Sequence, residues 1–202
     1  MNPDIIQKPA SALSLFLNEI HPLSQDAITT IDREVFYVNV PKGRFLAKPG
    51  LDKNFYLILK GVMRAYVKIE GKEITTWISE ENEIAGSING LITGEAGDEY
   101  IQALEETECV GIPAELVQYL FRKYPETNVV GRILLEHCYR NAEERAFITR
   151  IPSAEKRYKR FIATRPLLVE RISLKYIASY LNMTLETISR VGGRKTLIEV
   201  AA

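Results

Sequence analysis

The sequence contains few of the residues on which metal and redox chemistry depends. It has two cysteines and two histidines among 202 residues. Two cysteines cannot provide a disulfide framework or the four thiolates of a standard iron–sulfur cluster. Two histidines make a histidine-rich metal site hard to build. No Ser/His/Asp, Cys/His or phosphate-loop arrangement is present to support catalysis. We therefore predict no metal site, no cofactor and no enzymatic activity.

Long apolar runs are also missing. No uncharged run reaches the roughly 18 apolar residues of a membrane-spanning helix. The N-terminus begins Met-Asn-Pro-Asp, without the basic residues of a secretory signal peptide. The composition is 46% hydrophobic and 26% charged, as in an ordinary globular protein. These features predict a cytoplasmic protein that has no membrane partner.

Basic residues are absent from a long central stretch. Between Lys72 and Arg122 the sequence contains eleven acidic residues and no lysine or arginine. A pocket built mainly from this stretch would be negatively charged unless cations from other segments neutralise it.

The two parts of the chain differ in net charge. Residues 1–150 contain 16 basic and 22 acidic side chains, a net charge of −6, and residues 151–202 contain 10 basic and 4 acidic side chains, a net charge of +6. The split indicates an acidic body followed by a basic module, which suits a polyanion such as DNA.

The first part of the chain is expected to form two short helices followed by many short strands. The helices are predicted at residues 11–20 and 24–32. Apolar and polar residues alternate at 36–40 and 62–69, and residues 55–59 are a run of strand formers. Turn residues recur about every 8–12 positions between residues 34 and 112. The predicted strands are 36–40, 55–59, 62–69, 74–78, 100–103 and 108–112. This pattern predicts an antiparallel β-sandwich or barrel.

After residue 112 the pattern becomes helical. One helix is expected to begin at Pro113, and a second to begin at Pro125 and to run for about 25 residues, against a usual length of about 11–12. The second helix carries a heptad-like stripe that predicts pairing with a second copy of the chain. The alternative is a helix that packs only on its own barrel. The predicted dimer contacts are Val130, Ile133, Leu134, His137, Asn141 and Ile148.

The basic C-terminal segment contains two short helices separated by a sharp turn. Ser173 is the predicted cap of the first helix, residues 174–181, and Thr184 is the predicted cap of the second. Ala178 is small, as required where two helices cross closely, and Asn182 accepts the left-handed backbone of a sharp turn. These spacings are typical of a helix-turn-helix, whose second helix enters the major groove of DNA.

Three polar side chains of the second helix share one face. Glu186, Ser189 and Arg190 stand three and four positions apart. Arginine can bind guanine in a bidentate manner, and glutamate can accept a hydrogen bond from cytosine. The alternative is an ordinary ion pair between Glu186 and Arg190 on a solvated helix. The predicted DNA contacts are Ser173, Lys175, Thr184, Glu186, Thr187, Ser189, Arg190, Arg194 and Lys195.

Two motifs connect the chain to a known family. They are Tyr56-Leu-Ile-Leu-Lys-Gly-Val-Met-Arg among the strands, and Ile177-Ala-Ser-Tyr-Leu with Glu186-Thr-Ile-Ser-Arg in the helix-turn-helix. On these residues the chain resembles the Crp/Fnr transcription regulators over about residues 10–191. The resemblance implies an α+β fold with a jelly-roll-like antiparallel β-roll of the cyclic-nucleotide-binding type, a long dimerisation helix and a C-terminal helix-turn-helix domain. It also implies a homodimer that binds two-fold-related DNA half-sites, with RNA polymerase as a further partner.

The resemblance divides the chain into three parts. Residues 1–124 would form the N-terminal helices and the β-roll, residues 125–151 the dimerisation helix, and residues 152–202 the helix-turn-helix domain. Gly192 and Gly193 are expected to stop the recognition helix early. About ten residues remain after Val191, too few for the usual wing hairpin.

The chain departs from the cyclic-AMP-binding members of this family at the effector pocket. The glutamate that binds ribose is replaced, and the arginine that binds phosphate is absent. A charge pair at ~4 Å and an effective dielectric of ~20 is worth about 4 kcal/mol, so its loss disfavours cyclic AMP. The alternatives are a sensor with non-standard cyclic-nucleotide binding and an impaired DNA module, and a cupin-type enzyme, against which the shortage of histidines argues. The pocket residues implied by the resemblance are Gly86, Ser87, Ile88, Asp98, Glu99 and Tyr100.

Overall fold

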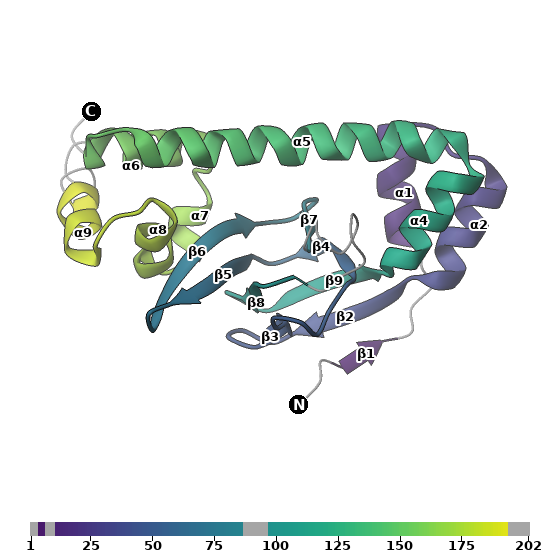
Figure 1. Ribbon diagram of the computed structural model, residues 1–202, viewed down its shortest axis with the longest axis horizontal. Helices are drawn as coiled ribbons and strands as arrows, with labels where there is room; N and C mark the ends of the chain where they lie inside the picture. The colour runs from purple at the N-terminus through teal and green to yellow at the C-terminus, as the bar shows by residue number, and fades with distance from the viewer. Residues whose placement is uncertain (1–3, 7–10, 87–96, 194–202) are drawn as a thin grey trace.

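The computed structural model describes residues 4–6, 11–86 and 97–193 (Figure 1). A β-roll occupies the middle of the molecule, with α1, α2 and α4 at one end and α6 to α9 at the other. The long helix α5 (Pro125–Arg150) runs above the roll and connects the two ends. The predicted fold class, α+β with an antiparallel β-roll, a long helix and C-terminal helices, is confirmed.

The roll consists of two antiparallel sheets. Their strand orders are β1-β2-β9-β4-β7 and β3-β8-β5-β6. The inward side chains between them include Ile58, Met63 and Cys109, all fully buried. Short strands β1, β3 and β7 were not predicted, because each has only two or three residues and shows no alternation. The strands are β1 (Asp4–Ile6), β2 (Phe36–Val40), β3 (Phe45–Ala47), β4 (Phe55–Lys60), β5 (Met63–Ile69), β6 (Lys72–Ser79), β7 (Ile84–Ala85), β8 (Tyr100–Ala103) and β9 (Thr107–Ile112).

Two tight turns fix the register of the central strands. In the β5–β6 hairpin, Glu70 and Gly71 have φ values of 50° and 77°, as a two-residue hairpin turn requires. Gly61, between β4 and β5, has a φ of +103°, and a Cβ atom there would lie 2.5 Å from the Thr107 hydroxyl oxygen. Only glycine fits at this position, which accounts for the Lys-Gly pair between two predicted strands.

Three helices close one end of the roll. They are α1 (Ser11–Ile20), α2 (Gln25–Glu34) and α4 (Ala114–Lys123). Leu13, Ile31 and Leu120 from these helices are buried against Leu57 and Val110 of the first sheet. The predicted helix bounds agree with these within two residues.

Helix α5 has a different exposed side from the one predicted. Val130 and Ile148 are 3% and 1% exposed, so they pack within their own chain and are not available to a partner. Naming them as dimer contacts was wrong, because both ends of α5 rest on its own neighbours. Ile133, Leu134 and Asn141 are half-buried, and His137 is exposed. The large apolar side chains that α5 exposes are Leu135, Tyr139 and Phe147.

The C-terminal helices form a separate core beyond α5. They are α6 (Ala154–Thr164), α7 (Leu168–Arg171), α8 (Leu174–Tyr180) and α9 (Leu185–Gly193), and their buried side chains include Phe161 and Ile188. Helix α9 includes Gly192 and ends at Gly193, which is the last described residue, so the predicted stop at these glycines is not tested. Gly192 lies against Tyr158, where a Cβ atom would be 3.2 Å from the hydroxyl oxygen. Packing on α6 outweighs the low helix propensity of glycine here.

Candidate nucleic-acid interface

The turn between α8 and α9 has the geometry that the sequence predicts. Asn182 is in the left-handed region with a φ of 52°. The amides of Asn182 and Met183 donate to the carbonyl oxygens of Ser179 and Ala178 at 3.2 and 2.8 Å, which is the Schellman pattern. This geometry ends α8 sharply and lets α9 cross it.

An arginine that the sequence analysis did not select supports this turn. The Arg157 guanidinium of α6 donates from Nη1 to the carbonyl oxygens of Leu181 and Asn182 at 3.1 and 3.0 Å. These carbonyls lie at the end of α8, where the helix offers them no amide partner. Arg157 therefore connects α6 to the turn of the helix-turn-helix.

The two predicted helix caps have different outcomes. The Thr184 hydroxyl accepts a hydrogen bond from the Thr187 amide at 3.2 Å, so Thr184 caps α9 as predicted. Ser173 occupies the N-cap position of α8, but its side chain makes no capping hydrogen bond. Ser173 and Thr184 are both exposed.

The outward side of α9 presents polar groups to solvent. Glu186, Ser189 and Arg190 are exposed, whereas Ile188 is fully buried on the opposite side. Among the ion pairs of the described residues, none joins Glu186 to Arg190. The Glu186 carboxylate and the Arg190 guanidinium are thus not paired with each other. Arg194 and Lys195 lie outside the described residues.

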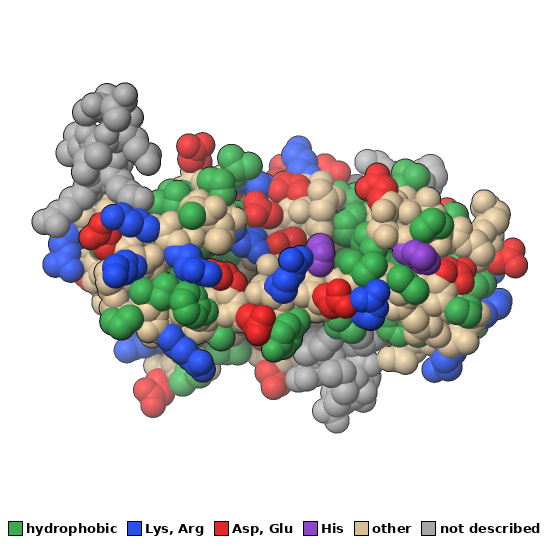
Figure 2. Space-filling view, turned by 90° about the horizontal axis from the view of Figure 1, so that it is seen from above, with side chains coloured by type: hydrophobic (Ala, Val, Ile, Leu, Met, Phe, Trp, Pro, Cys, Tyr) green, Lys and Arg blue, Asp and Glu red, His purple; other side chains and the backbone are tan. Residues whose placement is uncertain are grey.

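Positive charge gathers at this end of the molecule. Figure 2 shows lysine and arginine side chains clustered where α6, α8 and α9 lie. Exposed members include Lys156 of α6, Lys175 of α8 and Arg190 of α9. The Lys175 ammonium lies 4.6 Å from the centre of the Tyr176 ring. Exposed cations on neighbouring helices are typical of a surface that contacts phosphates.

The acidic stretch of the roll faces two arginines of the C-terminal segment. The Arg165 guanidinium lies 3.2 Å from Glu80 and 2.7 Å from Glu83. Arg171 makes a bidentate pair with Glu81, at 2.9 and 2.6 Å. Arg171 also pairs with Glu105. Part of the charge split between the two halves of the sequence therefore serves to hold the C-terminal helices against the roll.

Helix α8 covers the open edge of the second sheet. The Ser179 hydroxyl accepts from the Thr75 amide at 2.9 Å and donates to the Glu73 carbonyl oxygen at 3.1 Å. Strand β6 is an edge strand, so these bonds satisfy main-chain groups that would otherwise face solvent. The contact fixes α8, and with it α9, relative to the roll.

A buried arginine lies beneath this contact. Arg64 of β5 is 3% exposed, and its guanidinium lies 4.2 Å from the ring centres of both Tyr66 and Tyr176. Its Nε donates to Gln102 at 3.0 Å, and Nη2 pairs with Glu73. The sequence motif contains Arg64 but gives no sign of its burial, because the covering ring of Tyr176 comes from the other end of the chain.

Glu80 and Glu81 hold the C-terminal arginines against the roll, and their pKa values are shifted in opposite directions. The hydrogen bonds from Arg171 lower the pKa of Glu81 to about 2, and the Gly61 amide, which donates at 2.7 Å, acts in the same direction. Burial raises the pKa of Glu80 and outweighs its attraction to Arg165. The ionised form of Glu81 therefore stabilises the contact between the C-terminal helices and the roll.

We expect a Glu81→Gln variant to change how stability depends on pH. Because the pKa of Glu81 is lower in the folded chain, its stabilisation is present above about pH 5 and is lost as the pH falls towards 2. The difference in the free energy of unfolding between wild type and variant should thus be constant above about pH 5 and shrink between about pH 5 and pH 3. Urea denaturation at several pH values measures it, with Glu106→Gln, at an exposed acid of the same stretch, as control. A difference independent of pH contradicts the assignment.

The predicted effector residues are only partly brought together. Glu99 accepts hydrogen bonds from the Trp77 indole at 3.1 Å and from the Thr76 hydroxyl, and Tyr100 stacks on Tyr66 with ring centres 5.0 Å apart. A cavity beside Glu99 measures about 10 Å³, the size of one water molecule. Asp98 is exposed, and Gly86 has a φ of +151°. Ser87 and Ile88 lie outside the described residues.

Comparison with known proteins agrees with this architecture. The cyclic nucleotide-binding domain family matches residues 37–124. The fumarate and nitrate reduction regulatory protein of Vibrio cholerae serotype O1 is 28% identical over 171 residues, which are 77% of this chain and 66% of that protein. The structure of FixK2 from Bradyrhizobium japonicum superposes with a TM-score of 0.69 at 16% identity, over 82% of this chain and 86% of that one. In sequence and in fold the chain is thus similar to the Crp/Fnr regulators.

A further solved structure has a similar fold. The catabolite activator protein of Thermus thermophilus superposes with a TM-score of 0.51 at 21% identity, over 92% of this chain and 88% of that one. Within residues 11–86 and 97–193, no three His, Cys, Asp or Glu side chains form a group that could hold a metal ion. In the same part of the chain, no helix is long and apolar enough to span a bilayer.

Proposed function

We propose that this protein is a cytoplasmic, homodimeric transcription regulator of the Crp/Fnr type that binds specific DNA sequences. The observation that carries the proposal is the joint exposure of Glu186, Ser189 and Arg190 on one side of a capped helix that is buried on its other side. Helix α9 would lie in the major groove, with Arg190 on guanine and Glu186 on cytosine. Ser173, Lys175, Thr184, Thr187, Arg194 and Lys195 would complete the DNA contacts.

The proposal keeps the division of the chain into a sensor (residues 1–124), a dimerisation helix (125–151) and a DNA-binding part (152–202). Regulators of this family bind DNA as homodimers. Leu135 and Tyr139 of α5 are 45% and 65% exposed and stand four positions apart, so they would pack on the same side chains of a second α5. They take the place of Val130 and Ile148 as proposed dimer contacts.

Selection from a random-sequence DNA library tests this function. We expect the purified protein to enrich one motif with two-fold-related halves about one helical turn apart, and its affinity for that motif to fall steeply with salt. Sedimentation should give a dimer for the wild type and a monomer for Leu135→Glu/Tyr139→Glu, because two buried carboxylates oppose pairing. Binding of all sequences with equal affinity contradicts the proposal.

A further inference from the structure

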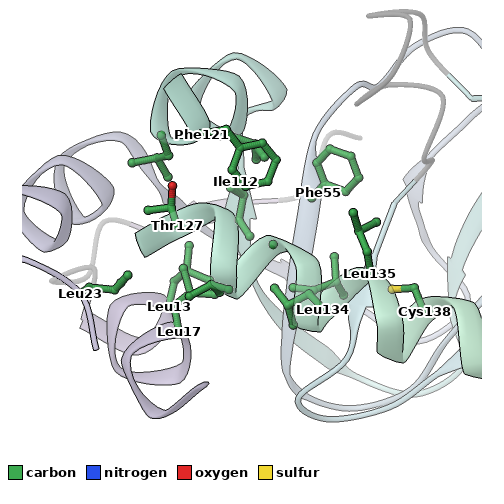
Figure 3. Close-up of a pocket in the computed structure, with 15 residues that line it drawn as sticks. Leu13, Leu17, Leu23, Phe55, Ile112, Phe121, Thr127, Leu134, Leu135 and Cys138 are labelled. Atoms are coloured by element: carbon green, nitrogen blue, oxygen red, sulfur yellow. The ribbon is translucent and has the colours of Figure 1, made fainter. Parts of the chain in front are cut away.

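An apolar cavity lies where α5 crosses the N-terminal end of the roll. It measures about 140 Å³ and lies between α1, α4 and α5 above strands β4, β7 and β9. Figure 3 shows Leu13, Phe55 and Leu134, from three of these elements, around the cavity. Leu13 and Phe55 are 1% and 9% exposed, so the floor lies beneath the surface of a single chain. The cavity thus reaches into the interior from the exposed side of α5, where Leu135 is 45% exposed.

The lining of this cavity offers almost no polar group. Its polar side chains are the Thr127 hydroxyl and the Cys138 thiol. The Thr127 hydroxyl already donates to the Tyr124 carbonyl oxygen at 2.7 Å. A charged or strongly polar ligand would lose its hydrogen bonds to water here and gain none in return, at a cost of several kcal/mol. A dry cavity of about 150 Å³ lined by Leu, Ile and Phe can bind benzene or xenon. Size and lining together therefore select an uncharged molecule no larger than one aromatic ring.

The cavity lies on the element that connects the roll to the C-terminal helices. Leu134 of α5 lines the cavity, and Ile148 of the same continuous helix is 1% exposed within the core formed with α6, α8 and α9. A ligand that displaces α5 at Leu134 must therefore also move the helix that enters this core. Tightly packed interiors pass such displacements on, because they do not deform continuously.

We propose that this cavity binds a small, uncharged apolar ligand of the size of a single aromatic ring, and that this ligand is the effector of the protein. The effector role rests on the proposed DNA-binding function, whereas the binding site does not. An apolar effector is also consistent with the absence of the arginine that binds the phosphate of a cyclic nucleotide.

Titration of the full chain with benzene, followed by NMR, tests the site. We expect saturable shifts with a dissociation constant on the order of 0.1–1 mM. Benzoate should bind at least about 100-fold more weakly, because its carboxylate cannot be desolvated there. Absence of saturable benzene binding, or equal binding of benzoate, overturns the proposal.

A matched pair of variants locates the binding. Val117 of α4 lines the cavity, and Val129 of α5 is also half-buried but does not line it. Val117→Phe should weaken benzene binding at least about tenfold by filling the space, and Val129→Phe should change it less than about twofold. Equal effects of the two variants overturn the location. Should Val117→Phe not fold, diffraction from xenon-pressurised wild-type crystals decides: density between Leu13, Phe55 and Leu134 supports the site, and its absence overturns it.

DNA affinity measured with and without benzene tests the effector role separately. We expect saturating benzene to change the affinity for the selected DNA site at least about threefold in the wild type but not in Val117→Phe. Specific DNA binding that benzene does not change overturns the effector role and leaves the proposed function intact. If the protein without any ligand does not bind DNA specifically, the proposed function itself is wrong.

Discussion

Replacing Arg190 by alanine is expected to lower the affinity for the specific DNA site about 100-fold. Each dimer loses two guanine contacts, and each such contact is worth about 1–3 kcal/mol. The affinity for unrelated DNA should fall less than about threefold, because that binding depends on the total positive charge. Glu186→Ala should instead relax the preference at one base pair, with a smaller loss of affinity. Gel shifts with both DNAs at a fixed salt concentration measure these effects.

Arg33→Ala is the matched control for this experiment. Arg33 lies on α2 at the opposite end of the molecule, and its side chain is 69% exposed. The substitution removes the same charge from a surface with no proposed DNA contact. If Arg33→Ala and Arg190→Ala weaken specific binding equally, α9 does not contact the bases.

Replacing Arg64 by alanine is expected to destabilise the protein by about 3–4 kcal/mol. The substitution removes a guanidinium that lies between two tyrosine rings and leaves Gln102 and Glu73 without their donor. The lost hydrogen bonds of a buried guanidinium and its two ring contacts together account for an effect of this size, whereas Glu73, whose side chain is 42% exposed, stays solvated. Arg64→Lys should recover only part of the loss, since a lysine ammonium cannot form the planar, multidentate contact.

Urea denaturation followed by fluorescence of Trp77, the single tryptophan, measures the effect of Arg64. Protein concentration must be held constant, because the stability of a dimer depends on it. Arg44→Ala, which removes an exposed arginine, is the control and should cost less than about 0.5 kcal/mol. A loss for Arg64→Ala no larger than that of the control contradicts the role assigned to the buried guanidinium.

The local features of this protein could be predicted from its sequence. Strand β2 alternates in polarity, β4 is a run of strand formers, and the β5–β6 turn contains Gly71. Asn182 and Thr184 mark the end of α8 and the start of α9. Each of these signals depends on the conformational preference of a residue or on a short repeat. The short strand β3, which also bulges between Phe45 and Ala47, gives no such signal.

The long-range features could not be predicted in the same way. Arg171 is 90 residues from Glu81 in the sequence, and Tyr176 covers Arg64 from the opposite end of the chain. The acidic stretch was interpreted as a possible pocket lining, whereas it also docks the C-terminal helices. The prediction of Val130 and Ile148 as dimer contacts, made from the stripe on α5, was wrong for a related reason. Helical spacing shows which residues share a side, but not whether the chain itself or a second copy covers that side.

The central claim, that Arg190 of α9 contacts a base, is tested most directly by combining base-pair substitutions in the DNA with the Arg190→Ala variant. Each base pair of the selected DNA site would be substituted in turn, and the affinities of wild type and Arg190→Ala compared at every position. We expect one G·C pair in each half-site whose substitution weakens the wild type at least about tenfold but leaves Arg190→Ala unchanged. The same dependence on every base pair in both proteins would contradict the claim that α9 reads the DNA sequence through Arg190.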